Sequence, residues 1–198
     1  MDHASSLLEC VPAEKITDRP VIHLPRLTRL PAGGLTVTRT ARVEDFRAVQ
    51  SMHARCSVTS LAIRYFTATE RLSRSTWTGL CDREKGVTLL TGPGGDVRKV
   101  IAMTNILCTH DSGVVELAVL VEDAWQSRGL GSALASFALE VIQGQGVRAL
   151  TASVMTANGR AMRMLRGIGA TRCSQPGPEV DFRLDIGSIQ GAGTGAGR

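Results

Sequence analysis

One stretch of the chain combines the residue types that a phosphate-binding turn needs. The apolar run 114–121 is followed by Gln126-Ser127-Arg128-Gly129-Leu130-Gly131-Ser132, and an amphipathic helical pattern begins at once. A helix N-terminus leaves several backbone N–H groups unpaired, and its dipole favours negative charge. Glycines let the backbone approach a diphosphate closely. The segment therefore predicts a site for a phosphate-bearing ligand, to which Arg128 or Gln126 can add donors.

Three phosphate-loop patterns compete for this segment. A dinucleotide fingerprint requires glycine three residues after Gly131, where the chain has Leu134. A Walker loop requires Gly-Lys-Ser or Gly-Lys-Thr, and the chain contains neither triplet. The third pattern, Gln/Arg-x-x-Gly-x-Gly/Ala, matches at every fixed position from Gln126 to Gly131. With this match the chain resembles the GNAT acetyltransferase superfamily.

The resemblance implies how the strand before the loop takes part in binding. In that superfamily the strand end is splayed, and its backbone pairs with the pantetheine arm of acetyl-CoA, the co-substrate. No metal is expected. The cofactor-binding residues that the resemblance implies are Val119, Leu120, Val121, Gln126, Ser127, Arg128, Gly129, Leu130, Gly131, Ser132 and Asn158.

A second family element follows the loop. Asn158-x-x-Ala161, with Gly169-Ala170 further on, resembles the superfamily's helix signature Asn-x-x-Ala-x-x-x-Tyr-x-x-x-Gly-Phe. The resemblance implies that Asn158 contacts the cofactor; the equal alternative is that Asn158 only caps a helix. Leu165 stands where many of these enzymes have a tyrosine that protonates the leaving thiolate, and leucine cannot donate a proton. The thiolate of coenzyme A must then leave without a protein acid, or take its proton from water.

Glu116 is the only ionisable residue in the apolar run between Val114 and Val121. An amine acceptor has a reference pKa of about 10.4 and must lose a proton before attack, which calls for a general base near the thioester. We expect desolvation in so apolar a strand to raise the pKa of Glu116 toward the useful range. Glu116 lies about 16 Å before Val121 at strand rise, a span that suits an extended pantetheine arm. The alternative is a solvated or ion-paired carboxylate at a strand start.

The strand around Glu116 carries a narrower resemblance. The string Val-Glu-Leu-Ala-Val at 115–119 is similar to Pat-type bacterial protein lysine acetyltransferases. In those enzymes a Glu in this strand, followed by Ala-Val and then Gln-x-x-Gly-x-Gly, serves as the base, and the helix tyrosine is likewise missing. The Arg-Tyr-Phe at 64–66 is similar, more loosely, to their Arg-Phe-Phe segment.

These features together predict an N-acetyltransferase. Acetyl-CoA and an amine would bind in one ternary complex, with Glu116 as the catalytic base and the N–H of Val119 holding the oxyanion. The acceptor is a protein lysine, which the Pat-like string favours, or else a small-molecule amine such as a polyamine, an amino acid or an aminoglycoside. The alternative from another class is a catalytically degenerate acyl-CoA-binding module or sensor, which the missing tyrosine keeps open.

The remaining pattern predicts the elements that position these residues. Strands are expected at 35–40, 87–90, 99–109, 114–121, 149–155, 171–174 and 180–184, and helices from 44, within 58–83, and at 131–143 and 159–167. This order predicts a mixed α/β layer with a central antiparallel hairpin region and a parallel crossover. The resemblance implies an α/β fold with a GNAT-like mixed, mostly antiparallel sheet, flanked by helices and with a splayed central strand pair. Residues 1–34 are expected to be a partly ordered N-terminal extension, 35–186 the acetyltransferase domain, and 187–198 a disordered glycine-rich tail.

Composition limits the partners that this protein is expected to have. The 198 residues are 43% hydrophobic and 21% charged, as in an ordinary globular domain. No apolar run approaches the roughly 18 residues that span a bilayer, and the N-terminus lacks a secretory pattern, so a cytoplasmic protein is expected. A net charge of +5 suits an anionic ligand without making a case for nucleic acid. We expect neither nucleic acid nor a membrane as a partner, and we leave a homodimer open.

Several residues whose side chains could take part in catalysis or binding are interpreted as structural or solvent-exposed. Arg160, Arg163 and Arg166 are interpreted as a solvated helix face, with a phosphate contact by one of them as the minor alternative. His53 is interpreted as a structural residue on a helix face, and Cys108 has no activating partner near it in the sequence.

Overall fold

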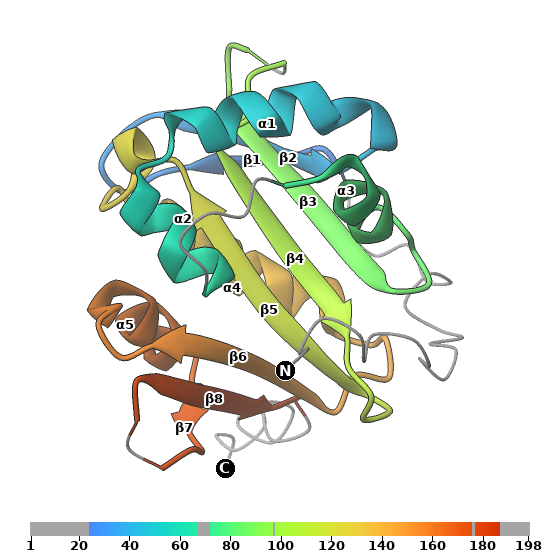
Figure 1. Cartoon of the computed structure of the whole chain (residues 1–198), viewed down its shortest axis with the longest axis vertical. Helices are drawn as coiled ribbons and strands as arrows, with labels where there is room; N and C mark the ends of the chain where they lie inside the picture. Colours follow the sequence, from blue (N-terminus) through green and yellow to red (C-terminus); the bar gives the residue numbers. More distant parts are fainter. Residues whose placement is uncertain (1–23, 67–71, 97, 176, 187–198) are drawn as a thin grey trace, which may run out of the picture.

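The computed structural model describes residues 24–66, 72–96, 98–175 and 177–186. In this part of the chain eight strands form one sheet in the order β1-β2-β3-β4-β5-β6-β8-β7 (Figure 1). The strands are β1 (Arg26–Arg29), β2 (Leu35–Thr40), β3 (Gly86–Pro93), β4 (Ala102–Cys108), β5 (Val114–Val121), β6 (Ala149–Met155), β7 (Thr171–Arg172) and β8 (Glu179–Asp185). All neighbouring strands are antiparallel except β5 and β6, which are parallel. The predicted mixed, mostly antiparallel α/β fold is confirmed.

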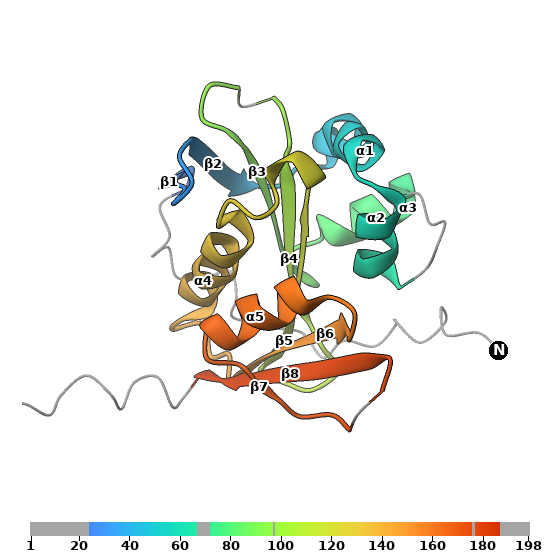
Figure 2. The ribbon, with the colours of Figure 1, turned by 90° about the vertical axis from the view of Figure 1, so that its left-hand side faces the viewer.

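Helices cover both faces of the sheet. They are α1 (Phe46–Arg55), α2 (Val58–Tyr65), α3 (Arg74–Leu80), α4 (Leu130–Ile142) and α5 (Gly159–Gly167), with the short 3-10 helices η1 (Val43–Asp45) and η2 (Asp123–Trp125). Figure 2 shows α1, α2 and α3 on one side of the sheet and α4 on the other. We call these sides the α1–α3 face and the α4 face.

Alternation along the strands explains this division. On β5, Val115 and Leu117 point to the α4 face and pack in a core cluster with Phe137 and Ala138 of α4. Leu120 has the opposite parity, and it packs in a second cluster with residues of α1 and α3. The long apolar run of β5 is therefore buried on both faces, as its composition predicts.

The parallel strands β5 and β6 separate early. Their register covers only Val114↔Ala149, Val115↔Leu150 and Glu116↔Thr151, although both strands continue well beyond it. Figure 1 shows the two strands diverging from this point. The predicted splayed strand pair is thus present, and the fork opens directly after Glu116.

The segment before β2 holds a strand that the sequence pattern does not predict. Arg26–Arg29 forms β1, which pairs antiparallel with β2. The Leu30 N–H donates to the Gly34 carbonyl, and Gly33 and Gly34 have φ of +85° and +100°. The Gly33-Gly34 pair is therefore the turn of a hairpin rather than a feature of a loose arm. Residues 1–23, and the tail predicted to be disordered at 187–198, lie outside the described residues.

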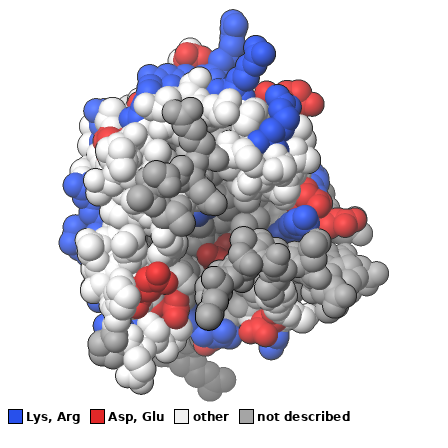
Figure 3. All heavy atoms as spheres, in the orientation of Figure 1, with Lys and Arg blue, Asp and Glu red and all other residues white. Residues whose placement is uncertain are grey.

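Charge is spread over the face seen in Figure 3. Basic and acidic side chains are interspersed there, and the basic ones do not gather into one continuous patch. Among the described residues no helix is long and apolar enough to cross a membrane.

Candidate functional site

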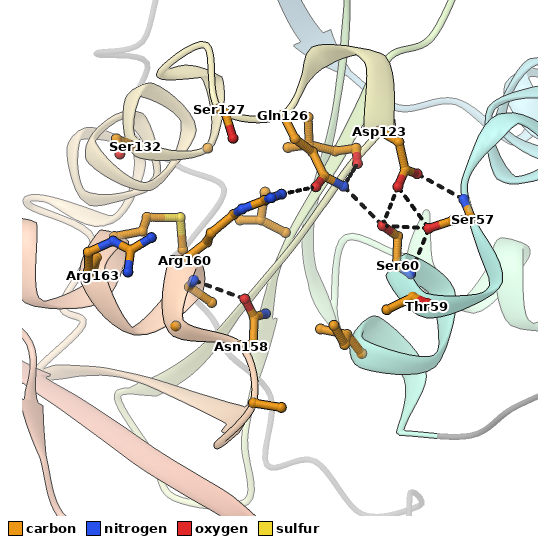
Figure 4. A pocket seen from close by; sticks show the side chains of 18 of the residues that line it. Ser57, Thr59, Ser60, Asp123, Gln126, Ser127, Ser132, Asn158, Arg160 and Arg163 are labelled. Carbon is orange, nitrogen blue, oxygen red and sulfur yellow. Dashed lines mark hydrogen bonds between the residues drawn. The ribbon is translucent and has the colours of Figure 1, made fainter.

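A cleft of about 850 Å³ lies beside the fork of β5 and β6. Its walls come from α2, the end of β5, the loop before α4, and the first turn of α5 (Figure 4). Of the predicted cofactor-binding residues, those that line this cleft are Val119, Val121, Gln126, Ser127, Gly129, Gly131, Ser132 and Asn158. The structure thus brings together residues from the two separate motifs at 126–131 and 158–161.

Three of the predicted cofactor residues do not line the cleft with their side chains. Leu120 is 3% exposed and packs in the cluster under α1 and α3, and Leu130 is 1% exposed. The Arg128 guanidinium lies over the Trp125 ring, with its Cζ 5.2 Å from the ring centroid. The buried side chains of Leu120 and Leu130 leave only their backbone groups to a ligand in the cleft, whereas Arg128 is exposed.

The loop before α4 presents backbone donors to the cleft. Gly129 is the N-cap of α4 with φ of +85°, and Ser127 also has a positive φ, of 58°. The first bond of the helix runs from the Ala133 N–H to the Gly129 carbonyl over 3.0 Å. The N–H groups just before Ala133 therefore have no partner within the helix, and they lie at its positive end. This is the arrangement that a diphosphate requires.

The β1–β2 hairpin supports this loop from behind. A Cβ atom on Gly129 would lie 2.8 Å from Cδ and 3.0 Å from Cγ of Pro31. Leu30, next to Pro31, is 2% exposed and packs with Leu130 and Leu134 of α4. Glycine is thus required at 129 for two reasons, its backbone angle and the contact with the Pro31 ring.

Gln126 ties three walls of the cleft together. Its Nε2 donates to the Val121 carbonyl and to Ser60 Oγ, each over 3.0 Å, and its Oε1 accepts from Arg160 Nη1 over 2.6 Å. Figure 4 shows this chain of contacts running from α2 across the loop to α5. The side chain predicted to contact the cofactor is therefore also engaged in holding the cleft in shape.

Asp123 anchors the start of α2 to the segment after β5. Its carboxylate accepts from the Ser57 N–H (2.8 Å), the Ser57 hydroxyl (2.7 Å) and the Ser60 hydroxyl (2.9 Å). Burial raises the pKa of Asp123, but the hydrogen bonds from Ser57 and Ser60 outweigh it, so that this pKa lies below its usual value. Neither Asp123 nor these serines is distinguished in the sequence by a motif.

The free edge of β5 faces the fork. The Val114 carbonyl accepts from Thr109 on the β4 side, whereas the Val115 carbonyl accepts from Thr151 of β6. Because backbone groups alternate along a strand, the N–H and C=O of Val119 point to the β6 side. The pairing with β6 has ended before this point. Val119 therefore offers a donor and an acceptor to a ligand lying in the fork.

Asn158 is the N-cap of α5. Its Oδ1 accepts from the Ala161 N–H over 3.1 Å, and its side chain also lines the cleft. The capping alternative is thus realised, and it leaves the position next to the cofactor loop intact. Leu165 on the same helix is 1% exposed and belongs to the main core cluster, so its side chain serves packing.

Glu116 lies at the base of the fork, and its side chain is exposed. The expectation that the apolar strand buries this carboxylate is wrong. Glu116 projects to the α1–α3 face, opposite Leu107 of β4, and is exposed there. Its neighbours Val115 and Leu117 are buried because they face α4 instead.

Polar side chains from α1, α2 and β4 lie on the α1–α3 face near Glu116, and two of them belong to the Arg-Tyr-Phe string at 64–66. Arg64 of α2 donates from Nη2 to Asn105 Oδ1 over 2.7 Å, and Tyr65 Oη is 2.6 Å from His53 Nε2. Burial lowers the pKa of His53, and the charge of Arg64 acts in the same direction. His53 is 8% exposed, in line with the structural role predicted for it.

Metal chemistry has no candidate site in the described part of the chain. No group of three or more His, Cys, Asp or Glu side chains there is arranged to hold a metal ion.

Comparison with known proteins identifies the family. A model of the acetyltransferase (GNAT) family matches residues 57–170, which is more than half of the chain. The fold is similar to the GNAT domain of S. lividans PAT, with a TM-score of 0.73 and 26% identity over 81% of this chain and 96% of that one. A search of the curated proteins found no match. The chain belongs to the GNAT acetyltransferase family.

Two further solved structures share the fold at lower identity. The ribosomal-protein-S18-alanine N-acetyltransferase from Escherichia coli matches with a TM-score of 0.59 and 17% identity, over 76% of this chain and 94% of that one. Mycobacterium smegmatis RimJ in complex with CoA-disulfide matches with a TM-score of 0.63 and 15% identity, over 84% and 90%.

Proposed function

We propose that the protein is an N-acetyltransferase that moves an acetyl group from acetyl-CoA to an amine by direct attack in a ternary complex. The observation that supports this most is the early end of the β5–β6 pairing, directly beside a loop with free backbone donors. Membership of the GNAT family supports acyl-CoA as the co-substrate.

The residues present fit acyl-CoA at three points. The start of α4 offers N–H groups for the diphosphate, the β6 side of Val119 offers a strand edge for the amides of pantetheine, and the cleft of about 850 Å³ has room for both. When bound, acyl-CoA supplies the thioester that is attacked.

Glu116 is the group that we assign to the proton chemistry. It accepts the proton that the acceptor amine must lose, while the amine nitrogen forms a bond to the acyl carbon and the carbon–sulfur bond breaks. Its exposed position on the α1–α3 face leaves it open to an acceptor that approaches from that side. The N–H of Val119 donates to the oxygen on which negative charge develops.

The leaving thiolate takes its proton from water in this proposal. Leu165 occupies the position of the usual tyrosine acid, and it is buried in the core, away from the cleft lining. A thiol has a reference pKa of about 8.5, so a thiolate is a tolerable leaving group near neutral pH.

A protein lysine or a small-molecule amine is the acceptor. The Val-Glu-Leu-Ala-Val string at 115–119 and the likeness to the GNAT domain of S. lividans PAT support the lysine. The exposed Glu116 suits either acceptor, because nothing among the described residues covers it.

The test is thiol release from acetyl-CoA in the presence of pooled amines, peptides and a cell lysate. The proposal expects that at least one pool accelerates release several-fold over the rate without acceptor. Tight CoA binding with no acceleration by any pool would instead indicate an acyl-CoA-binding module, and the enzyme proposal would be abandoned.

A further inference from the structure

Arg64 is a cation held between α2 and the sheet. Its Nη2 donates to Asn105 Oδ1 over 2.7 Å, and its Cζ lies 5.0 Å from the centroid of the Tyr65 ring. Its Nε is buried and has no hydrogen-bond partner among the described residues. Burial lowers the pKa of Arg64, while Tyr65 and Glu116 act to raise it.

The orientation of this guanidinium is fixed from the sheet side. Asn105 is 0% exposed, and its Nδ2 donates to Thr88 Oγ1 over 2.9 Å. Thr88 in turn donates its hydroxyl to the Leu80 carbonyl over 2.6 Å. Because the Asn105 amide donates its N–H to Thr88, its Oδ1 remains as an acceptor, and Arg64 donates to it.

Arg64 forms no ion pair in the described part of the chain. No carboxylate there comes within the 4.0 Å that defines an ion pair with Arg64, although Arg39 and Arg55 each have one, Asp45 and Glu122. Charges removed from water are normally paired, because desolvation of a lone ion is costly. The unpaired guanidinium and its unused Nε–H therefore indicate an anion that is brought by a ligand.

The position of Arg64 relates this anion site to the acceptor. Asn105 pairs with Ala118, which lies two residues after Glu116 on the same face of β5, about 7 Å along the strand. The residue before Arg64, Ile63, lines the cleft. A molecule that presents its amine to Glu116 on the α1–α3 face thus lies beside Arg64.

We propose that Arg64 binds a carboxylate of the acyl acceptor, so that the preferred acceptors carry a carboxylate a few bonds from the reacting amine. The planar fork of a guanidinium matches a carboxylate and discriminates it from a neutral amide. The proposal rests on the proposed function, since it takes Glu116 as the group that receives the amine proton. The carboxylate can come from either of two acceptors: a free amino acid that carries its own carboxylate, or a protein in which an acidic side chain lies beside the reacting lysine.

The experiment compares acceptors that differ only in this charge. β-Alanine is paired with β-alaninamide, and a lysine peptide flanked by aspartates is paired with the same peptide flanked by asparagines. Rates are compared at equal concentrations of the neutral amine, because the amine pKa differs within each pair. We expect kcat/KM about tenfold or more higher for the carboxylate member of at least one pair, and the pair that responds identifies the source.

Variants of Arg64 then connect the preference to this residue. R64Q should abolish the preference, chiefly through a higher KM for the carboxylate member, and R64K should restore part of it. R47Q, at an exposed position of α1, is the control and should keep the full preference. CoA affinity and the melting temperature are measured for each variant to confirm that the cofactor cleft is intact.

Equal kcat/KM for both members of every pair would overturn the inference, as would an R64Q protein that keeps the preference. Should R64Q fail to fold, the acceptor pairs on the wild-type protein decide alone. Turnover without any preference overturns only this inference, whereas no turnover with any amine overturns the proposed function as well.

Discussion

The two sides of β5 differ in how the chain builds them. On the cofactor side, backbone groups between Val119 and Ser132 form the loop and the strand edge, in one continuous piece of chain. On the acceptor side, Arg64, Asn105 and Glu116 come from three elements that meet only across the sheet. A site made of local backbone leaves a motif in the sequence, whereas a site made of dispersed side chains does not.

Removal of the Glu116 carboxylate should abolish most of the turnover but leave CoA binding intact, and this is the largest expected effect. E116Q should lower kcat at neutral pH by about two to four orders of magnitude, because a general base contributes that much. The measurement is thiol release at saturating acceptor, with CoA affinity determined by calorimetry. CoA should bind as tightly as to the wild type. E44Q, at an exposed position in η1, is the matched control. Unchanged turnover in E116Q would remove Glu116 from the mechanism.

Leu165 should contribute to core packing on the α4 face and not to cofactor or acceptor binding. L165A should lower the free energy of unfolding by about 2–5 kcal/mol, as removal of a fully buried leucine does. Urea unfolding followed by circular dichroism measures it. M162A, at a half-buried position of the same helix, should cost less. A cost below that of M162A would contradict the packing role of Leu165.

A side chain at position 129 should weaken CoA binding, while the general base Glu116 stays unchanged. A non-glycine residue at φ of +85° costs about 1–2 kcal/mol, and the Cβ would also meet Pro31 at 2.8 Å. G129A should therefore weaken CoA binding about tenfold or more, measured by calorimetry. G144A carries the same backbone strain, with φ of +73° and no atom within 4 Å, and should leave CoA affinity unchanged. Equal CoA affinity for wild type and G129A would refute the loop assignment.

Asp123 joins the two sides, and its contribution should be the smallest. Its pKa lies below the ordinary value of about 3.9, so its stabilising effect is complete above that pH and is lost as pH falls through the lower, folded-state value. D123N should therefore be less stable than wild type near pH 7, by up to about 1 kcal/mol for so exposed a group. The difference in stability between D123N and wild type should vanish at pH values below the folded-state pKa of Asp123. Urea unfolding at several pH values measures it, and a difference that grows toward low pH would contradict the stated hydrogen bonding.

The same contrast accounts for what could be predicted from the sequence. The β5 strand and the helices at 130–142 and 159–167 follow from hydrophobic period and the glycine loop, and the fork follows from the family resemblance that the loop carries. Strand β1 is missed because its four residues, Arg26–Arg29, are too few to show a period, and their pairing depends on β2. The burial of Glu116 is mispredicted because apolar neighbours on a strand indicate two covered faces, whereas Glu116 itself is exposed on the α1–α3 face.

The residues on the acceptor side could not be predicted from a single sequence, and the reason is physical. Arg64 and Asn105 are 41 positions apart, and their contact depends on the register of β4 with β5 and on the packing of α2. The string 64–66 resembles a family segment, but no period or spacing reveals an unpaired guanidinium. Only the absence of an ion pair to Arg64 among the described residues does so.

The claim on which the rest depends is that acyl-CoA binds along the free edge of β5 beyond the fork. Amide hydrogen exchange along β5, with and without CoA, tests it most directly. We predict that CoA slows exchange at the N–H of Val119, while the N–H groups of Ala118 and Leu120, which point toward β4, change little because they are already paired. Unchanged exchange at Val119 with CoA bound would contradict the account.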